Sequence, residues 1–225
     1  GFVIPNMGGG GTERDISLLS SEYIRQGYPV AVMQFAGYKK AYELDPAVED
    51  FSISAQSKGN PFVYIGRIIR MRRYWKANPD AYIFAFCVMG AICSVISTIG
   101  MHRRILVAER SSPESCNIPR LRDWAYRRAQ VIVFQTKYGT TFFDKKIVDK
   151  AVVIPNPVVL SDTTGVYTGI RTHRVVTVGR LFKGKNQEML LRAFADFHRE
   201  YPDYELHVYG NGDMEEQLKG IAADI

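Results

Sequence analysis

Short apolar runs rich in β-branched residues alternate along the chain with longer stretches of helical periodicity. The apolar runs predict β-strands at residues 2–4, 30–34, 82–86, 105–108, 131–134, 152–154, 175–178 and 206–209. Between most of them, apolar residues three or four positions apart predict amphipathic helices, as in 190–197. Because strands and helices alternate, the chain predicts an α/β fold with mostly parallel sheets and helices on both faces.

One long apolar segment, residues 81–100, has two possible structures. The segment (AYIFAFCVMGAICSVISTIG) carries no charge and is long enough to span a bilayer. Its first part is β-like, its second part is helix-like, and Gly90 interrupts it. A buried strand followed by a buried helix is the commoner source of such a run in an α/β domain, so we favour that structure over a membrane span.

A polar stretch after two prolines indicates a domain boundary. Residues 154–157 (IPNP) end a strand, and residues 161–173 are polar and weakly patterned. We therefore predict a Rossmann-like domain at 1–158, a linker at 159–172, and the start of a second Rossmann-like domain at 173–225. Two strand–helix units do not complete a doubly wound sheet. We therefore expect the chain to continue beyond Ile225 and the 225-residue piece alone to be inactive.

Composition and charge indicate a globular protein with an anionic partner. Of the residues, 46% are hydrophobic and 23% charged, and 29 Lys and Arg against 23 Asp and Glu give a net charge of +6. This excess fits a nucleotide phosphate, a membrane surface or a nucleic acid without choosing among them. Cys87, Cys93 and Cys116 form no CxxC pair, which argues against a disulfide framework or a zinc site and fits a reducing cytoplasm.

A glycine-rich loop, MGGGGTER, follows the first predicted strand at residues 7–14. Its glycines allow close approach of a ligand, and the following helix offers free N–H groups to a phosphate. Thr12 and Asp15 are spaced as a helix-capping pair. The loop lacks the spacing of a GxGxxG dinucleotide fingerprint or a P-loop, which disfavours a redox enzyme. It therefore indicates either a phosphate-binding turn or a tight turn without a ligand.

A basic loop follows the strand predicted at 175–178 and leads into a helix for which Asn186 is the expected N-cap. Arg180 and Lys185 lie in this loop, at the carboxyl end of the strand, where open α/β sheets bind ligands. A guanidinium fork and an ammonium group suit a diphosphate and would stabilise it as a leaving group. For Lys183 we favour the other interpretation, an exposed surface charge.

Five motifs, taken in order, resemble the family 4 retaining glycosyltransferases. They are GFVIPNMGGGGTERDISLLS, VAERSSP, VIVFQT, VVIPNPV and VGRLFKGKNQEMLLRAFADFHREYPDYELHVYGNGD, and they cover nearly the whole chain. The most similar subgroup comprises bacterial enzymes that build surface polysaccharides or lipid-linked oligosaccharides. The resemblance implies a two-domain GT-B fold. It also implies transfer of a hexosyl group from a nucleotide sugar to a glycan or a lipid-linked acceptor, with retention of configuration. The nucleotide of the donor is expected to be UDP.

The resemblance also implies roles for individual residues. Arg180 and Lys185 match the family's pyrophosphate-binding pair and would be the catalytic residues, while Glu109 and Arg110 match a Glu-Arg element near the cleft. The residues expected to bind the donor and its phosphates are Gly10, Gly11, Gly179, Arg180, Lys185 and Asn211. A histidine that many relatives carry after the strand at 82–86 is absent, and the family's paired glutamates are expected beyond Ile225. No cofactor or obligatory metal is expected, because the two cations can offset the charge of the leaving phosphate.

Two other functions stay open. A sugar-nucleotide epimerase or hydrolase of the same fold would share these loops, and a non-catalytic nucleotide-binding fragment would need only some of them. Transfer to an added acceptor separates the first of these from a glycosyltransferase.

A basic segment at residues 66–76, GRIIRMRRYWK, also contains interleaved aromatic and aliphatic residues. This pattern suits an anionic lipid surface, and it equally suits a surface helix with a buried apolar stripe. The membrane-binding candidates are Arg67, Arg70, Arg72, Arg73, Trp75 and Lys76. Because acceptors in this family are often lipid-linked, we expect a cytoplasmic protein bound peripherally to the cytoplasmic face of the membrane. Nucleic acid binding is not expected, since no recognised motif accompanies the segment.

Overall fold

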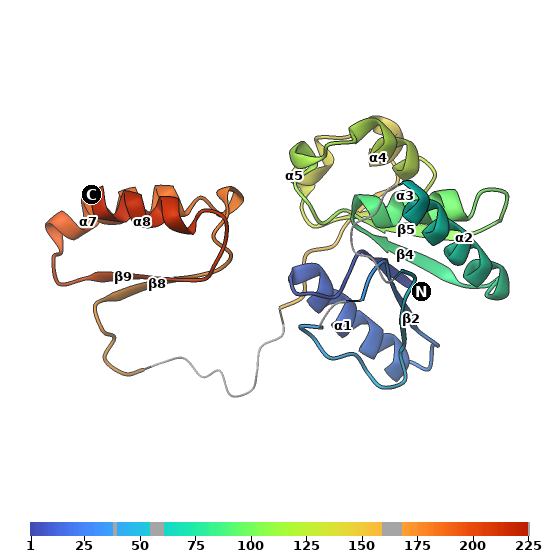
Figure 1. Cartoon of the computed structure of the whole chain (residues 1–225), viewed down its shortest axis with the longest axis horizontal. Coiled ribbons are helices and arrows are strands. Elements are labelled where there is room, and N and C mark those ends of the chain that lie inside the picture. The colour runs from blue at the N-terminus through green and yellow to red at the C-terminus, as the bar shows by residue number, and fades with distance from the viewer. Residues whose placement is uncertain (38–39, 55–60, 159–167, 225) are drawn as a thin grey trace. The chain divides into compact units, whose positions relative to one another are not determined.

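The computed structural model describes residues 1–37, 40–54, 61–158 and 168–224 (Figure 1). The chain divides into two compact units, Gly1–Val159 and Leu160–Ile225. Strands and helices largely alternate along the chain, and all strand pairs are parallel, so the predicted α/β fold class is confirmed.

The first unit is built on a seven-stranded sheet with the order β3-β2-β1-β4-β5-β6-β7. The strands are β1 (Phe2–Ile4), β2 (Ala31–Gln34), β3 (Glu49–Ser52), β4 (Tyr82–Phe86), β5 (Arg104–Ala108), β6 (Val131–Phe134) and β7 (Ala151–Val153). The strand order reverses between β1 and β4. The carboxyl ends of these two strands therefore flank the position at which open parallel sheets bind ligands.

Helices cover both faces of this sheet because successive strand residues point to opposite sides. The helices are α1 (Gly11–Arg25), α2 (Pro61–Ala77), α3 (Cys87–Ser97), α4 (Pro119–Tyr126), α5 (Lys137–Thr140) and α6 (Lys145–Val148), with a 3₁₀ turn η1 (Pro113–Ser115). In β1, Phe2 and Ile4 pack with Ile16 of α1 in one buried cluster. Val3, between them, belongs to the cluster on the opposite face, with Trp75 of α2 and residues of α3 and α4.

Residues 81–100 form the buried strand β4 and the largely buried helix α3, so the favoured interpretation of this segment is confirmed. No helix in the described part of the chain is long and apolar enough to cross a membrane. The sequence predicts no strand at β3, because its residues (EDFS) form no apolar run. Strand β3 lies at the edge of the sheet and contributes little to the core.

The second unit contains two parallel strands, β8 and β9, with both of its α-helices on one side of them (Figure 1). Its elements are β8 (Arg174–Val178), the 3₁₀ turn η2 (Lys183–Lys185), α7 (Gln187–Glu200), β9 (Glu205–Tyr209) and α8 (Glu215–Asp224). Both strands begin one residue before the sequence predicts. The predicted domain ranges and the predicted linker at 159–172 stay predictions.

Candidate functional site

The glycine loop connects β1 to α1 at the point where the strand order of the first sheet reverses. Gly9 has φ of +124°, a backbone conformation that suits glycine. Gly10 is the N-cap residue of α1, which begins at Gly11, and as a glycine it has no side chain to cap the helix. The predicted capping pair of Thr12 and Asp15 is therefore wrong, because the helix begins before Thr12. Among the described residues, no side chain accepts a hydrogen bond from the first N–H groups of α1, which suits an anion.

Strand β2 anchors the glycine loop through the buried side chain of Gln34. The Oε1 atom of Gln34 accepts a hydrogen bond from the Met7 N–H at 3.2 Å, and its Nε2 atom donates to Asp50 Oδ1 at 2.7 Å. The Met7 carbonyl in turn accepts from the Ala41 N–H at 3.1 Å. These bonds hold the loop at the carboxyl edge of the sheet. Gln34 is not among the residues predicted from the sequence, where its signal is a polar residue at the end of an otherwise apolar strand.

Arg110 connects the carboxyl end of β5 to the first turns of α1 by an ion pair with Asp15. Both side chains are only 6% exposed. Burial lowers the pKa of the Arg110 guanidinium, but arginine starts so far above neutrality that the group stays charged. The arginine of the predicted Glu-Arg element therefore forms a buried ion pair between the end of β5 and helix α1, next to the glycine loop.

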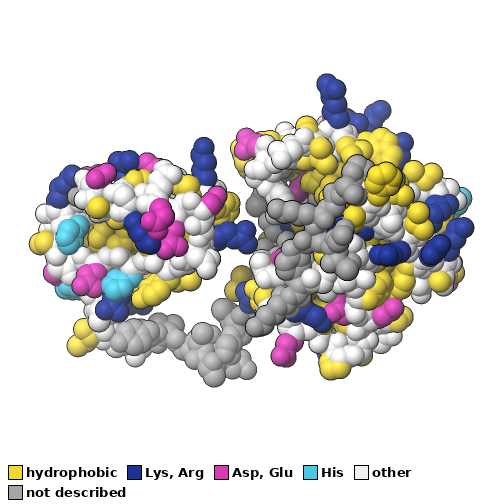
Figure 2. Space-filling model, in the orientation of Figure 1, with side chains coloured by type: hydrophobic (Ala, Val, Ile, Leu, Met, Phe, Trp, Pro, Cys, Tyr) yellow, Lys and Arg dark blue, Asp and Glu magenta, His cyan; other side chains and the backbone are white. Residues whose placement is uncertain are grey.

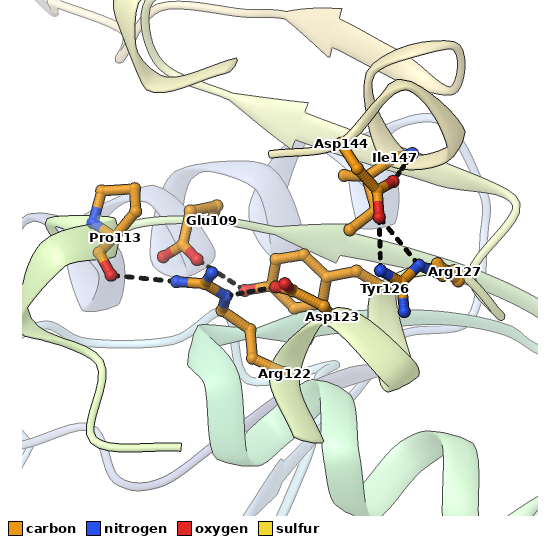
Figure 3. Close-up of polar contacts among 8 residues, drawn as sticks. All are labelled: Glu109, Pro113, Arg122, Asp123, Tyr126, Arg127, Asp144 and Ile147. Atoms are coloured by element: carbon orange, nitrogen blue, oxygen red, sulfur yellow. Dashed lines mark hydrogen bonds and ion pairs between the residues drawn. The ribbon is translucent and has the colours of Figure 1, made fainter. Parts of the chain in front are cut away.

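Both carboxylate oxygens of Glu109 accept hydrogen bonds within the fold. Oε1 accepts from the Ser111 N–H at 2.9 Å. Oε2 accepts from the Tyr126 hydroxyl at 2.7 Å (Figure 3). Burial and the Glu109 charge raise the pKa of Tyr126, so the hydroxyl keeps the proton that it donates. Glu109 is buried among these partners and holds the loop after β5 in place.

Arg122 of α4 holds the next part of the same loop (Figure 3). Its Nη1 atom donates to the Pro113 carbonyl at 2.9 Å, its Nε atom donates to Asp123 Oδ1 at 2.8 Å, and its guanidinium lies 4.4 Å from the centre of the Phe143 ring. The β5–α4 loop is therefore held at two points, one near each end. Tyr126 and Arg122 are not among the residues predicted from the sequence, because their contacts depend on tertiary packing.

Cys87 begins α3 at the carboxyl end of β4, across the strand-order reversal from the glycine loop. It is partly exposed and has φ of +64°, which is uncommon for a residue other than glycine. Burial, with the nearby charges of Glu109 and Glu13, raises the pKa of its thiol to about 12. The thiol is therefore neutral at physiological pH and unsuited to nucleophilic attack. In the described residues, no group of three or more His, Cys, Asp or Glu is placed to hold a metal ion.

In the second unit, Arg180 and Lys185 are exposed in the loop between β8 and α7. Neither forms an ion pair with another described residue. The Arg180 carbonyl accepts from Gln187 Nε2 at 2.9 Å, which fixes the loop to the first residue of α7. Asn186 occupies the N-cap position as predicted, but its backbone is left-handed and its side chain makes no capping hydrogen bond. The expected cap is therefore absent, and the start of α7 lies open beside two cations.

The loop after β9 lies directly against the loop after β8. The Leu181 N–H donates to the Asn211 carbonyl at 2.8 Å, and the Met214 N–H donates to the Leu181 carbonyl at 3.1 Å. A Cβ atom on Gly210 would clash with the Gly179 carbonyl oxygen, and one on Gly212 would clash with that of Leu181. The structure therefore brings Gly179, Arg180 and Asn211 together within the second unit.

Gly212→Ala is expected to destabilise the second unit by about 1–3 kcal/mol, because the added methyl group must displace the backbone of the neighbouring loop. Thermal unfolding of the full-length protein, followed by hydrogen exchange in residues 174–224, measures this effect. Gly220→Ala in α8 is the matched control, since nothing lies within 4 Å of its Cβ position. Alanine there is expected to be neutral or to stabilise the helix. Equal behaviour of the two variants would contradict the proposed packing of the loops.

The membrane-binding candidates of α2 do not share one exposed surface, so the prediction is corrected for several of them. Trp75 and Arg67 are buried. Arg70 donates to the Ile53 carbonyl, and Arg72 donates to the Ile99 carbonyl at 2.8 Å, so both guanidinium groups bind the backbone of the fold.

Comparison with known proteins identifies relatives of both units. Residues 171–225, which include the Arg180–Lys185 loop, match the family described as Glycosyl transferases group 1. Over 99% of its length the chain is 25% identical to an uncharacterized glycosyltransferase of Haemophilus influenzae, and it spans 64% of that protein.

Solved structures show the same fold at low sequence identity. HepE of Anabaena, solved in complex with UDP and glucose, has a TM-score of 0.74 and 17% identity, with 100% of this chain and 64% of HepE aligned. WaaG, a glycosyltransferase involved in lipopolysaccharide biosynthesis, has a TM-score of 0.68 and 14% identity, with 99% of this chain and 66% of WaaG aligned. The chain thus spans less than two thirds of each relative. It has the α/β fold of the GT-B glycosyltransferases over that part of their length, and the matches together support a GT-B glycosyltransferase.

Proposed function

We propose that the full-length protein transfers a hexosyl group from a nucleotide sugar, expected to be UDP-linked, to a glycan or lipid-linked acceptor with retention of configuration. The observation that carries this proposal is the loop between β8 and α7. There, Arg180 and Lys185 are exposed without an ion-pair partner among the described residues, next to the uncapped start of α7. Two cations and free helix N–H groups form a binding site for a diphosphate.

Two comparisons support this assignment. The match to Glycosyl transferases group 1 covers the whole loop, and HepE, which has the same fold, was solved with UDP and glucose. The free cysteines fit the proposed location in the cytoplasm, a reducing compartment.

The reaction needs no nucleophilic side chain in this proposal. The bond between the sugar C1 and the diphosphate oxygen breaks, and the acceptor oxygen forms a new bond to C1 on the same face of the sugar. The acceptor proton passes to the leaving phosphate oxygen, which gives a nucleoside diphosphate and the glycosylated acceptor. Arg180 and Lys185 offset the negative charge that develops on the leaving group, and the proposal requires no metal ion.

The test is turnover by the full-length protein with a panel of UDP-hexoses and with oligosaccharide or polyprenyl-phosphate acceptors. We expect UDP release that depends on the acceptor, and a product whose anomeric configuration, measured by NMR, matches that of the donor. Conversion of the sugar without an acceptor would instead identify an epimerase or hydrolase. An inverted product would contradict the retaining mechanism.

A further inference from the structure

The outward face of α2 is apolar in its first half and cationic in its second. Phe62, Ile65 and Ile69 are 78%, 51% and 46% exposed. At 3.6 residues per turn, Arg73 and Lys76 continue the same face, and both are exposed. No Asp or Glu occurs in the helix. The exposed stripe therefore joins three large apolar side chains to two cations without an acidic residue.

The opposite face of α2 accounts for the packing of the helix. Met71 and Trp75 are fully buried in the core, and the Arg67 guanidinium lies 5.3 Å from the Phe35 ring. The helix is therefore attached to the sheet without help from its outer side chains. The apolar residues of the outer face have no described neighbours that cover them, so their exposure calls for a partner outside the unit.

The apolar end of α2 lies on the side of the sheet where the glycine loop lies. Phe35 directly follows β2, so its contact with Arg67 places the middle of α2 near the carboxyl edge. Trp75 lies near Gly1, which precedes β1, so the end of α2 reaches the amino edge. Phe62 precedes Arg67 by about 7 Å of helix and thus lies at the carboxyl edge or beyond it.

Ile99 extends the exposed surface beside α2. It lies in the turn between α3 and β5, is 56% exposed, and its carbonyl accepts the hydrogen bond from Arg72 of α2. Hydrophobic and basic side chains accordingly lie side by side over the part of the first unit that contains α2 (Figure 2).

We propose that this surface, named here the α2 face (Phe62, Ile65, Ile69, Arg73, Lys76 and Ile99), docks on an anionic lipid membrane. The apolar side chains would enter the boundary between headgroups and acyl chains, and the cations would contact lipid phosphates. Lipid fits better than nucleic acid, which would leave the apolar stripe exposed to water. Docking of this face does not depend on the proposed transfer reaction. Of the six predicted membrane-binding residues, the α2 face keeps only the exposed Arg73 and Lys76.

The test measures binding of the full-length protein to two kinds of vesicle, one of phosphatidylcholine alone and one with equal parts of phosphatidylcholine and phosphatidylglycerol. We expect binding to the anionic vesicles that weakens as salt is added. Arg73→Glu/Lys76→Glu is expected to lower the affinity at least about tenfold. Phe62→Ser/Ile65→Ser/Ile69→Ser is expected to lower it at least about tenfold as well, by a loss that persists at high salt.

The matched control is Lys145→Glu/Lys146→Glu, which makes the same change of charge on exposed residues of α6. We expect this variant to bind as the unchanged protein does. Circular dichroism and UDP affinity report whether each variant folds. Vesicle binding is measured separately from sugar transfer, so a failure of the transfer reaction is distinguished from a failure of docking. Equal losses in the α2 and α6 variants, or no binding of the unchanged protein to anionic vesicles at low salt, would overturn the proposal. The proposal would also be overturned if the α2 variants lost binding to a protein partner but still bound anionic vesicles.

Discussion

Arg180→Ala and Lys185→Ala are each expected to lower kcat for sugar transfer by the full-length protein about 100- to 1,000-fold. Both side chains are exposed in the loop between β8 and α7, and no described residue neutralises them. In the proposed reaction, negative charge grows on the diphosphate as the bond to the sugar breaks. Cations that meet this charge stabilise the transition state more than the bound donor, so kcat should fall more than the donor KM rises.

Steady-state kinetics with saturating acceptor measures this effect. Lys183→Ala is the matched control, because it removes an exposed cation from the same loop at a position that we interpret as solvated. We expect it to change kcat less than about threefold. Arg180→Lys should recover only part of the activity, since lysine keeps the charge but lacks the planar fork. Turnover and donor affinity unchanged in both alanine variants would contradict the assignment.

Asp15→Ala and Arg110→Ala are each expected to destabilise the first unit by about 3–5 kcal/mol. Each variant leaves one charge buried without its partner, since both side chains are only 6% exposed. The pair also connects β5 to α1, next to the glycine loop, so weaker binding of the acceptor or donor should accompany the loss of stability.

Tryptophan fluorescence during urea unfolding measures this stability. The chain's two tryptophans, Trp75 and Trp124, both lie in the first unit, so the signal does not report on the second. Lys145→Ala is the control, because its ion pair with Asp149 is well exposed and should contribute less than about 0.5 kcal/mol. A loss below about 1 kcal/mol in both core variants would show that the buried pair contributes little.

Periodicity predicts the buried strands well and the edge strand β3 not at all. β1, β4 and β6 have the predicted bounds because each is a short apolar run buried in the sheet. Strand β3 has no such pattern, since its pairing with β2 rather than its side chains makes it a strand. The prediction of a helix cap at the start of α1 is wrong for a similar reason. Thr12 and Asp15 have the spacing of a cap, but the buried contact between Asp15 and Arg110 decides the role of the aspartate.

The candidate site likewise contains residues whose position follows from the local sequence and residues whose position depends on tertiary contacts. The exposed loop that carries Arg180 and Lys185 could be predicted because a strand, a basic loop and a helix are local in sequence. Gln34 and Tyr126 could not, because their partners lie 27 and 17 residues away and depend on the packed fold. The α2 candidates were partly wrong because the basic segment contributes side chains to both faces of the helix. Only the fold shows that Trp75 packs in the core.

Calorimetric titration of the full-length protein with UDP and with uridine tests whether the loop between β8 and α7 binds the diphosphate of a nucleotide sugar. We expect the unchanged protein to bind UDP more tightly than uridine. Arg180→Ala/Lys185→Ala should weaken UDP binding about 100-fold or more, at roughly 1.5–3 kcal/mol for each lost charged hydrogen bond. Uridine affinity should stay the same. Equal UDP affinity in the variant and the unchanged protein would contradict the assignment of this loop as the diphosphate site.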